Sequence, residues 1–342
     1  MYNEHTVAVV VPAYNEAGFV GEVIETLPPF VDRVYAIDDR STDETWAEIT
    51  AAAEAVNDAA PNSETDDAAP NSETASAADA ASTDGGAAFD RRVVPIRRET
   101  NRGVGGAIKT GYLRAREDAV DVTAVMGGDG QMDPTELERI IQPITTGEAE
   151  YAKGNRLINR EHHAEMPRFR LVGNRILTLL TKIASGYWRV GDPQMGYTAI
   201  SLSALRETDI ENMYEFYGYC NDLLVRLNVA GHRVADVPSP LNYGDEHSDI
   251  SYLTYIPRVS LMLLRTFLWR LWSGRRQARG VATLVLYVGV AVGTVSSLLA
   301  ALADDSDQST ASALGGVFVL LVAMVADGLF NWPQNSRVDP DD

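Results

Sequence analysis

The segment TVAVVVPAYNE, residues 6–16, has the pattern that decides the fold. A short apolar run with strand character breaks off at a proline, and polar and acidic residues follow. The segment RVYAIDDRSTD, residues 33–43, repeats this form. A helical pattern follows each segment, beginning near Glu16 in the first case and near Asp43 in the second. This spacing predicts two strand–helix units in succession.

The same alternation continues along the chain. The apolar runs RVVPIRR, VTAVMGGD and EAEYAKGNR are separated by helical patterns that begin near Gly103 and Pro134. Strand and helix in regular alternation predict an α/β fold, with a mostly parallel sheet and helices on both faces. Such sheets bind ligands at the carboxyl ends of their strands. The polar motifs of this sequence all fall at those ends, so we expect the functional site there.

The first two strands end in acidic motifs. PAYNE follows the first strand, and DDRSTD, which begins with Asp38 and Asp39, follows the second. Carboxylates at successive strand ends can accept hydrogen bonds from a base and from ribose hydroxyls. The alternative is that Asp38 and Asp39 cap the next helix, a role that also suits Ser41 or Thr42.

The third strand leads into NRGVGGA, residues 101–107. Closely spaced glycines before a helix, here Gly103 and Gly105 after Asn101, permit a ligand to approach the backbone. A tight strand-to-helix turn explains them equally well, because the spacing does not match the dinucleotide pattern G-x-G-x-x-G.

The fourth strand ends in MGGDGQMDP, residues 126–134. Asp129 is a hard oxygen ligand, and Gln131 lies two residues further on. A divalent cation held there would clamp a diphosphate leaving group and neutralise its developing charge. Asp133, directly before Pro134, is better explained as a helix N-cap.

The charge balance excludes one class of partner. The net charge is −19, and a nucleic-acid binder needs a basic footprint. Only three of the 29 basic residues are lysines, which together with the acidity suggests a halophilic source. The single cysteine, Cys220, excludes disulfides within the chain and thiolate metal clusters. The apolar N-terminal run is too short for a signal peptide.

Residues 151–190 reverse the overall charge. They hold eight bases and only two acids, which favours an anionic ligand over a solvated face. Arg170 and Asn174 are four residues apart and therefore share one side of a helix. This places them to hold a phosphate group of such a ligand. By contrast, residues 57–88 form an acidic low-complexity insert in which DAAPNSET occurs twice, and we expect this insert to be a disordered loop.

Two apolar stretches, residues 281–303 and 311–332, close the sequence. The first has 23 uncharged residues and would be about 35 Å long as a helix, enough to cross a hydrocarbon layer of roughly 30 Å. The second contains Asp327, which lies close enough to the end of the stretch to reach the headgroups. A buried hairpin of a soluble domain is the alternative. The pattern predicts a two-helix transmembrane hairpin.

Arginines flank this hairpin on both sides, and the DDSDQST linker within it has no basic residue. The positive-inside rule then places the N-terminal domain, residues 1–250, and the tail, residues 333–342, in the cytoplasm, so the protein is expected in the cell membrane with two spans. Residues 251–279 mix six arginines with Leu, Phe and Trp, which predicts amphipathic helices lying on an anionic membrane surface.

Taken together, these strand ends resemble family 2 glycosyltransferases of the GT-A fold, and in particular the dolichyl- or polyprenyl-phosphate hexosyltransferases, including the Agl-type enzymes of archaeal N-glycosylation. The resemblance covers roughly residues 6–258 without the insert. It implies a Rossmann-like GT-A domain that transfers a hexose from a nucleotide diphosphate sugar to dolichyl phosphate with inversion. It also implies the first step of lipid-linked glycan assembly, with a UDP-hexose favoured over GDP-mannose.

The resemblance also assigns roles to individual residues. Catalytic roles fall on Asp129, Arg156 in KGNR, Asp192 in DPQMGY and, in support, Asp222. Metal binding, of Mg²⁺ or Mn²⁺, falls on Asp129 with Gln131, and the helix of Arg170 and Asn174 would meet the lipid phosphate. The residues expected to bind the nucleotide sugar are Pro12, Tyr14, Glu16, Asp38, Asp39, Asn101, Gly103, Gly105, Gln194 and Gly196.

One position departs from the family pattern. The usual metal motif is Asp-x-Asp, and here Gly127 occupies its first position. Asp129 must then carry the ion with the donor diphosphate, Gln131 and water. Three other functions remain open: a transferase that extends a lipid-linked saccharide, a nucleotidyltransferase, and a catalytically silent, sugar-nucleotide-binding membrane scaffold. The nucleotidyltransferase is disfavoured because no basic glycine-rich loop follows the first strand.

Overall fold

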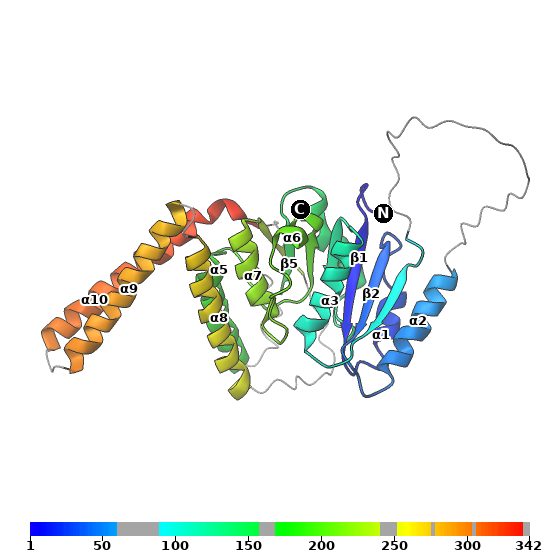
Figure 1. Ribbon diagram of the computed structural model, residues 1–342, viewed down its shortest axis with the longest axis horizontal. Coiled ribbons are helices and arrows are strands. Elements are labelled where there is room, and N and C mark those ends of the chain that lie inside the picture. The colour runs from blue at the N-terminus through cyan, green and yellow to red at the C-terminus, as the bar shows by residue number, and fades with distance from the viewer. Residues whose placement is uncertain (60–88, 157–167, 240–251, 275–277, 303–305, 338–342) are drawn as a thin grey trace, which may run out of the picture.

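The computed structural model describes residues 1–59, 89–156, 168–239, 252–274, 278–302 and 306–337. An eight-stranded sheet forms the centre, with strand order β3-β2-β1-β4-β6-β5-β7-β8 (Figure 1). The strands are β1 (Val7–Ala13), β2 (Arg33–Asp38), β3 (Val93–Arg97), β4 (Val122–Val125), β5 (Tyr151–Asn155), β6 (Thr198–Ser201), β7 (Val234–Pro238) and β8 (Asn335–Arg337).

The helices of the catalytic domain connect these strands. They are α1 (Val20–Glu25), α2 (Thr45–Ala59), α3 (Val104–Glu117), the short 3₁₀ helix η1 (Pro134–Glu136), α4 (Leu137–Thr145), α5 (Arg168–Ser185), α6 (Leu202–Glu207) and α7 (Tyr219–Ala230). The C-terminal part holds α8 (Tyr252–Gly274), α9 (Ala278–Leu302), α10 (Ser306–Phe330) and the 3₁₀ turn η3 (Trp332–Gln334).

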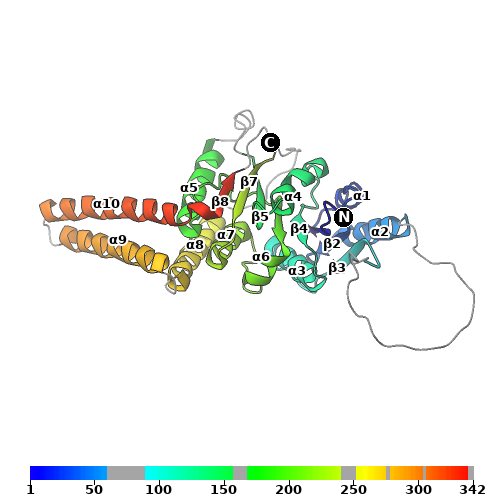
Figure 2. The same cartoon turned by 90° about the horizontal axis from the view of Figure 1, so that it is seen from above.

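The period-2 geometry of β1 explains why helices cover both faces. Val7, Val9 and Val11 point into one core, beneath α1, α2 and α4. Ala8 and Val10 point into the other core, which α3, α6 and α7 cover. Figure 2 shows the sheet from above, with α1 and α4 on one side and α3 and α6 on the other. The predicted layer arrangement is confirmed.

The sheet departs from a purely parallel pattern at one strand. β6 runs antiparallel to both of its neighbours, β4 and β5, whereas the other pairs are parallel. Because of this reversal, the amino end of β6 lies at the same edge of the sheet as the carboxyl ends of β4 and β5. The segment that precedes Thr198 therefore reaches the edge at which the functional site is expected.

The insert was predicted to begin at residue 57, and this boundary is wrong. Residues 57–59 belong to α2, and Asn57 fixes this last turn by exchanging two hydrogen bonds with the backbone of Val93 in β3, at 2.8 and 2.9 Å. The amide of Asn57 thus ties the helix end to the sheet. Residues 60–88 lie outside the described part of the chain.

The chain after α10 returns to the catalytic domain. β8 pairs in parallel with β7 and adds an eighth strand to the sheet. α9 and α10 pack against each other as a hairpin that projects from the side of the domain covered by α5 and α8 (Figures 1 and 2). One helix in the described part, at Gly280–Ser297 within α9, is long and apolar enough to cross a membrane, and Val317–Phe330 in α10 is a shorter apolar segment.

Candidate active site

Three of the predicted motifs meet where β1, β2 and β4 end. The amide of Asp39 donates to the carbonyl of Ala13 at 2.9 Å, and the amide of Gly128 donates to the carbonyl of Pro12 at 3.1 Å. The three strands are neighbours in the sheet, so their carboxyl ends share one edge. The structure thus brings the PAYNE, DDRSTD and MGGDGQMDP segments together.

The turn after β1 is held by hydroxyl groups from the segment after β2. Asn15 has a left-handed backbone with φ of 57°, and its amide donates to Ser41 Oγ at 3.0 Å. The amide of Glu16 donates to Thr45 Oγ1 at 2.8 Å. Tyr14, next to this turn, is exposed. These cross-links hold the backbone of the turn in place while Tyr14 stays accessible to a ligand.

Asp38 is fully buried and fixes the turn that follows β2. One carboxylate oxygen accepts a hydrogen bond from the amide of Ser41 at 2.9 Å, and the other forms an ion pair with Arg97 Nε at 3.0 Å. The Asp38 carboxylate therefore stabilises a turn and does not face open solvent. Its predicted contact with the nucleotide stays a prediction.

Asp39 joins the end of β2 to the start of α3. Its carboxylate accepts from Arg98 Nη1 at 2.7 Å, from the amide of Gly103 at 2.7 Å and from the amide of Arg102 at 3.2 Å. Burial raises its pKa, although these three donors oppose the rise. The structure thus places Asp39 beside the predicted nucleotide-binding segment 101–107, and Asn101 Oδ1 also accepts from the amide of Gly103, at 3.1 Å.

The glycines at the start of α3 are approached closely by the chain's own backbone. The amide of Gly106 donates to the carbonyl of Glu215 at 2.8 Å, and Gly103 adopts a left-handed φ of 86°. A Cβ atom added to Gly105 would lie 2.5 Å from the carbonyl oxygen of Tyr214. Packing against the segment that precedes α7 therefore explains Gly105, whereas its contact with a ligand stays a prediction.

Substitution of Gly105 by alanine is expected to destabilise the protein by about 1–3 kcal/mol, because the new methyl group would press on backbone atoms that have little room to move. A matched control is Gly173→Ala in α5, where the added Cβ atom meets nothing within 4 Å. The control is expected to be neutral or to stabilise by about 0.5–1 kcal/mol. Chemical unfolding of both variants measures the difference, and equal stabilities would contradict the packing role.

The Asp129 carboxylate lies half-buried at the same strand edge. One of its oxygens accepts from the amide of Gln131 at 3.1 Å and so closes a tight turn. A Cβ atom at Gly127 would lie 2.9 Å from that oxygen, so the glycine leaves Asp129 the room to take this position. Asp133 caps η1 by accepting from the amide of Thr135 at 2.8 Å, which confirms its predicted role.

The side-chain oxygens at this edge of the sheet suit a divalent ion that is bound mainly by a substrate. Among the described residues, no three or more His, Cys, Asp or Glu side chains gather into a metal-binding group. Asp129 and Gln131 supply oxygen donors, and Mg²⁺ characteristically binds one or two carboxylates together with substrate phosphates and water. The residues present therefore suit an ion that arrives with a diphosphate, and they do not form an all-protein cage.

Arg156 and Asp192 form a bidentate pair at the carboxyl end of β5. Arg156 Nε and Nη2 donate to the two carboxylate oxygens of Asp192 at 2.6 and 3.2 Å. They meet because β6 is antiparallel, so the DPQMGY segment before it lies beside the end of β5. Gln194 and Gly196 belong to this segment, and Gly196 lies beside Tyr219 of α7. The structure thus joins two motifs that are 36 residues apart.

Asp192 makes a contribution to stability that depends on pH. Burial opposes its ionisation, but the charge and hydrogen bonds of Arg156 outweigh burial, so its pKa lies below the ordinary 3.8. A lowered folded-state pKa means that the contribution is present above about pH 4 and is lost as the pH falls through the folded pKa. We expect the stability difference between wild type and Asp192→Asn to shrink from neutral pH to below pH 3.8. Denaturation at a series of pH values measures it, and a growing difference would contradict the assignment.

Two buried polar residues beneath this pair were missed from the sequence. Lys153 is fully buried and donates to the carbonyl groups of Gly154 and Asp192. Asp236 of β7 accepts from the side chain of Asn155, and burial raises its pKa. The signal for Asp236 was an acid inside the apolar strand ADVP. Together these residues support the backbone that carries Arg156 and Asp192.

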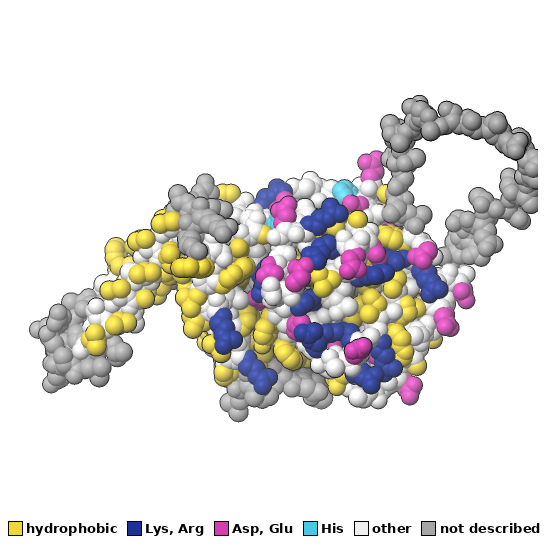
Figure 3. All heavy atoms as spheres, viewed as in Figure 1, with side chains coloured by type: hydrophobic (Ala, Val, Ile, Leu, Met, Phe, Trp, Pro, Cys, Tyr) yellow, Lys and Arg dark blue, Asp and Glu magenta, His cyan; other side chains and the backbone are white. Residues whose placement is uncertain are grey.

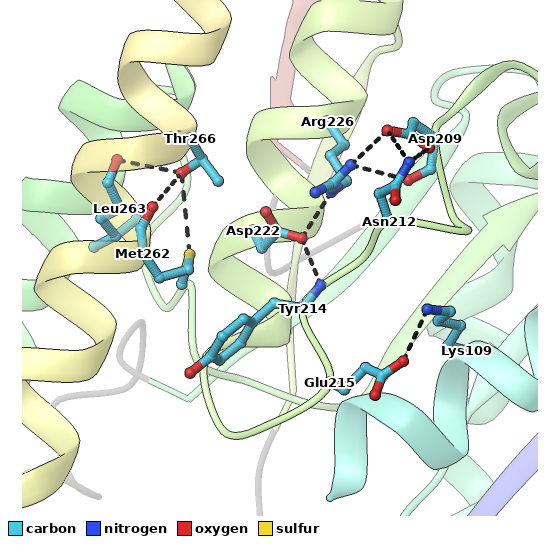
Figure 4. A network of polar contacts seen from close by, with 10 residues as sticks. All are labelled: Lys109, Asp209, Asn212, Tyr214, Glu215, Asp222, Arg226, Met262, Leu263 and Thr266. Atoms are coloured by element: carbon cyan, nitrogen blue, oxygen red, sulfur yellow. Dashed lines mark hydrogen bonds and ion pairs between the residues drawn. The ribbon is translucent and has the colours of Figure 1, made fainter. Parts of the chain in front are cut away.

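Asp222 lies in a separate network at the start of α7 (Figure 4). Its carboxylate accepts from Arg226 Nε at 2.7 Å and from the amide of Tyr214 at 2.8 Å, and burial raises its pKa. Arg226 Nη1 also binds Asp209, at 2.9 Å. Asp222 therefore anchors the segment that packs on Gly105, and its predicted part in catalysis stays a prediction. No pattern in the sequence indicated a role for Arg226.

The predicted acceptor residues lie on α5. The backbone of Arg170 belongs to the first turn of this helix, and its side chain lies outside the described part. Asn174 follows one turn later and is half-buried. The shared helix face predicted from their spacing is consistent with α5, and the binding role of both residues stays a prediction.

Comparisons with known proteins agree with this arrangement. Residues 8–60 and 65–209 match the family described as Glycosyl transferase family 2. The chain is 28% identical over 230 residues to the UDP-N-acetylglucosamine–dolichyl-phosphate N-acetylglucosaminyltransferase of Methanococcus voltae, covering 67% of this chain and 82% of that protein. It is also 28% identical over 334 residues to Glycosyltransferase AglD of Haloferax volcanii, covering 96% of this chain but only 47% of that protein.

Solved structures show the same fold. Glucosyl-3-phosphoglycerate synthase from Mycobacterium tuberculosis, in complex with Mn²⁺, UDP and glucosyl-3-phosphoglycerate, superposes with a TM-score of 0.50 at 19% identity. The match covers 78% of this chain and 80% of that one. The family match spans the strand edge that carries Asp39, Asp129, Arg156 and Asp192. The chain therefore belongs to glycosyl transferase family 2 and is a glycosyltransferase with a GT-A fold.

Proposed function

We propose that this protein transfers a hexose from a nucleotide diphosphate sugar to dolichyl or another polyprenyl phosphate at the cytoplasmic face of the membrane, with inversion. A UDP-sugar is the proposed donor, and the first step of lipid-linked glycan assembly for N-glycosylation is the proposed place of the reaction. Support comes from relatives named for dolichyl phosphate and, in Micrococcus luteus, for undecaprenyl phosphate, the latter 29% identical over 153 residues.

An apolar surface beside the candidate site carries this proposal. On α8 the side chains of Leu261, Leu264, Leu268 and Trp272 are each about half exposed, and on the adjacent α5 Ile176, Leu179 and Leu180 are exposed as well. Large exposed apolar faces of this kind mark contact with a membrane or a partner. Figure 3 shows this apolar surface continuing onto the helical hairpin. A lipid acceptor is confined to the membrane, so a soluble acceptor would not require such a surface.

The C-terminal strand supports the proposed topology. Because β8 pairs with β7, the chain that follows α10 lies on the same side as the catalytic domain. A hairpin of two spans, α9 and α10, returns the chain to the side from which it started. Outward-facing valines and leucines along both helices, such as Val285, Leu321 and Val325, are more than half exposed, as lipid contact requires.

The chemistry proposed for the site depends on charge and positioning. A lipid phosphate is largely ionised near neutral pH, so it can attack the anomeric carbon without a strong general base. Arg156, held in place by two hydrogen bonds to Asp192, is proposed to face the donor phosphates and to stabilise the departing diphosphate. A divalent ion bound by Asp129 and Gln131 would supply further charge neutralisation for that leaving group.

The test uses membranes that contain the full chain. They are given dolichyl phosphate and, one at a time, labelled UDP-glucose, UDP-N-acetylglucosamine and GDP-mannose, and label extracted into organic solvent is measured. We expect one of the UDP-sugars to give a lipid product that requires dolichyl phosphate. A product formed only on an added lipid-linked saccharide would favour the extending transferase instead. Donor binding without transfer to any lipid would favour the silent scaffold.

A further inference from the structure

The described residues form a cavity of about 300 Å³ between α7, α8 and the segment that precedes α7. Tyr214, Arg226, Arg258, Leu261 and Arg265 are among its lining residues. Its size is at the lower end of the range for ligand pockets, about 300–1,000 Å³, which suits a headgroup. Its described lining residues come from α7, α8 and the segment before α7, and none belongs to α5, where the acceptor phosphate is predicted.

Three arginines and one acid, Asp222, line the cavity, and two of the arginines have no acidic partner among the described residues. Arg226 is paired with Asp222 and Asp209 and stacks over Trp269, with 5.4 Å between the guanidinium carbon and the ring centroid. Arg258 and Arg265 are exposed, and neither has a hydrogen-bond or ion-pair partner among the described residues. In a chain with a net charge of −19, two unpaired arginines at one cavity favour an anionic ligand.

The same face of α8 is also apolar. Arg258, Leu261, Arg265, Leu268 and Trp272 follow one another at intervals of three and four residues, so they share one side of the helix. All five are exposed. The two arginines are about 10.5 Å apart along the axis, so both long side chains can converge on one phosphate. A ligand for this face combines an anionic group with an apolar chain.

We propose that this cavity binds the phosphate headgroup of an anionic membrane phospholipid, with its acyl chain along Leu261 and Leu268. The site is separate from the acceptor site on α5, and the inference rests on the proposed membrane location. The segment from Tyr214 to Asp222 connects the cavity to the start of α3 through the Gly106–Glu215 hydrogen bond. Figure 4 shows the ring of Tyr214 extending toward α8, while the carboxylate of Asp222 turns to Arg226 and to the amide of Tyr214. A bound lipid would therefore orient the catalytic domain on the bilayer.

Native mass spectrometry of the detergent-solubilised full chain tests the site. With equal amounts of phosphatidylglycerol and phosphatidylcholine, we expect preferential retention of one phosphatidylglycerol. The double variant Arg258→Gln/Arg265→Gln is expected to bind it at least about tenfold more weakly, because two charge-assisted contacts are lost. The control Arg206→Gln removes an exposed charge on α6 and is expected to leave binding unchanged. Equal binding by the double variant would overturn the proposal.

Three further measurements show which phosphate compound the cavity binds and distinguish failure of this inference from failure of the proposed function. Displacement of phosphatidylglycerol by inorganic phosphate at matched concentration would assign the cavity to a free anion. Preferential retention of polyprenyl phosphate would assign it to the acceptor. Either result would overturn the phospholipid site. Flotation with vesicles of equal parts phosphatidylglycerol and phosphatidylcholine tests the membrane location. Failure of the wild type to float would contradict the proposed function, whereas flotation of the wild type together with equal phosphatidylglycerol retention by the double variant would contradict only this inference.

Discussion

Substitution of Asp129 by asparagine is expected to lower sugar transfer by about 10²–10³-fold, the effect typical of losing one group that stabilises transition-state charge. Asparagine preserves the size of the side chain and can still accept the hydrogen bond from the amide of Gln131, which is 3.1 Å long here. The variant should therefore fold normally. What it loses is the carboxylate charge that would hold a divalent ion against the donor diphosphate.

The matched control for this experiment lies four residues further along the same loop. Asp133→Asn removes the same charge, but Asp133 serves as the cap of η1, and asparagine caps helices about as well as aspartate. Transfer by this variant should stay near the wild-type rate. Both rates are measured in membranes with the preferred donor over a range of Mg²⁺ and Mn²⁺ concentrations. Undiminished transfer by Asp129→Asn would show that its carboxylate is not needed for the reaction.

Substitution of Arg270 by glutamine is expected to destabilise the protein by about 3–5 kcal/mol, because it leaves Asp327 buried without its charge partner. Arg270 of α8 and Asp327 of α10 form a bidentate pair at 3.1 and 2.7 Å, and Asp327 is only 1% exposed. Arg270 Nη2 also donates to the carbonyl of Ile183 in α5, at 3.0 Å. The pair therefore joins α5, α8 and α10 at the base of the hairpin.

An exposed ion pair provides the comparison. Arg114 lies on the surface of α3, 3.4 Å from Glu117, and Arg114→Gln should change stability by less than about 1 kcal/mol. The midpoint of thermal unfolding in detergent is measured for both variants. Asp327→Asn and the double variant Arg270→Gln/Asp327→Asn complete a double-mutant cycle that isolates the interaction between the two side chains. The double variant should lose less stability than the sum of the losses in the two single variants. A fully additive cycle would show that the two side chains do not stabilise each other.

The pattern of the sequence was sufficient to predict the layers of the fold and the meeting of the polar motifs at one edge of the sheet. Apolar runs that end in polar residues require strands whose carboxyl ends meet at one edge, and the segments after β1, β2 and β4 meet there. Boundaries were less predictable. α1 begins at Val20 instead of near Glu16, and the insert begins later than residue 57 because Asn57 bonds to the neighbouring strand.

The partners of charged side chains could not be predicted in the same way. The position of Asp327 near the headgroups stays a prediction, and its ion pair with Arg270, which is 57 residues earlier in the chain, could not be predicted. Arg156 was assigned to the phosphates, but its bidentate pair with Asp192 was not predicted. The pair forms because β6 runs antiparallel, which brings the segment before β6 to the end of β5. An ion pair forms only where the fold brings two chain segments within a few ångströms of each other. For segments that are far apart in the sequence, residue spacing does not tell which of them meet.

The sequence by itself therefore determined the strand–helix alternation that opens with residues 6–16, the polar edge and the apolar C-terminal helices, because these follow from local periodicity and composition. Only the tertiary structure decided that β8 joins the sheet and that the segment before α7 fills the space at Gly105. It also decided that Arg258 and Arg265 line a cavity without an acidic partner in the described part of the chain. Each of these features depends on packing between distant segments, which is set by the fold as a whole.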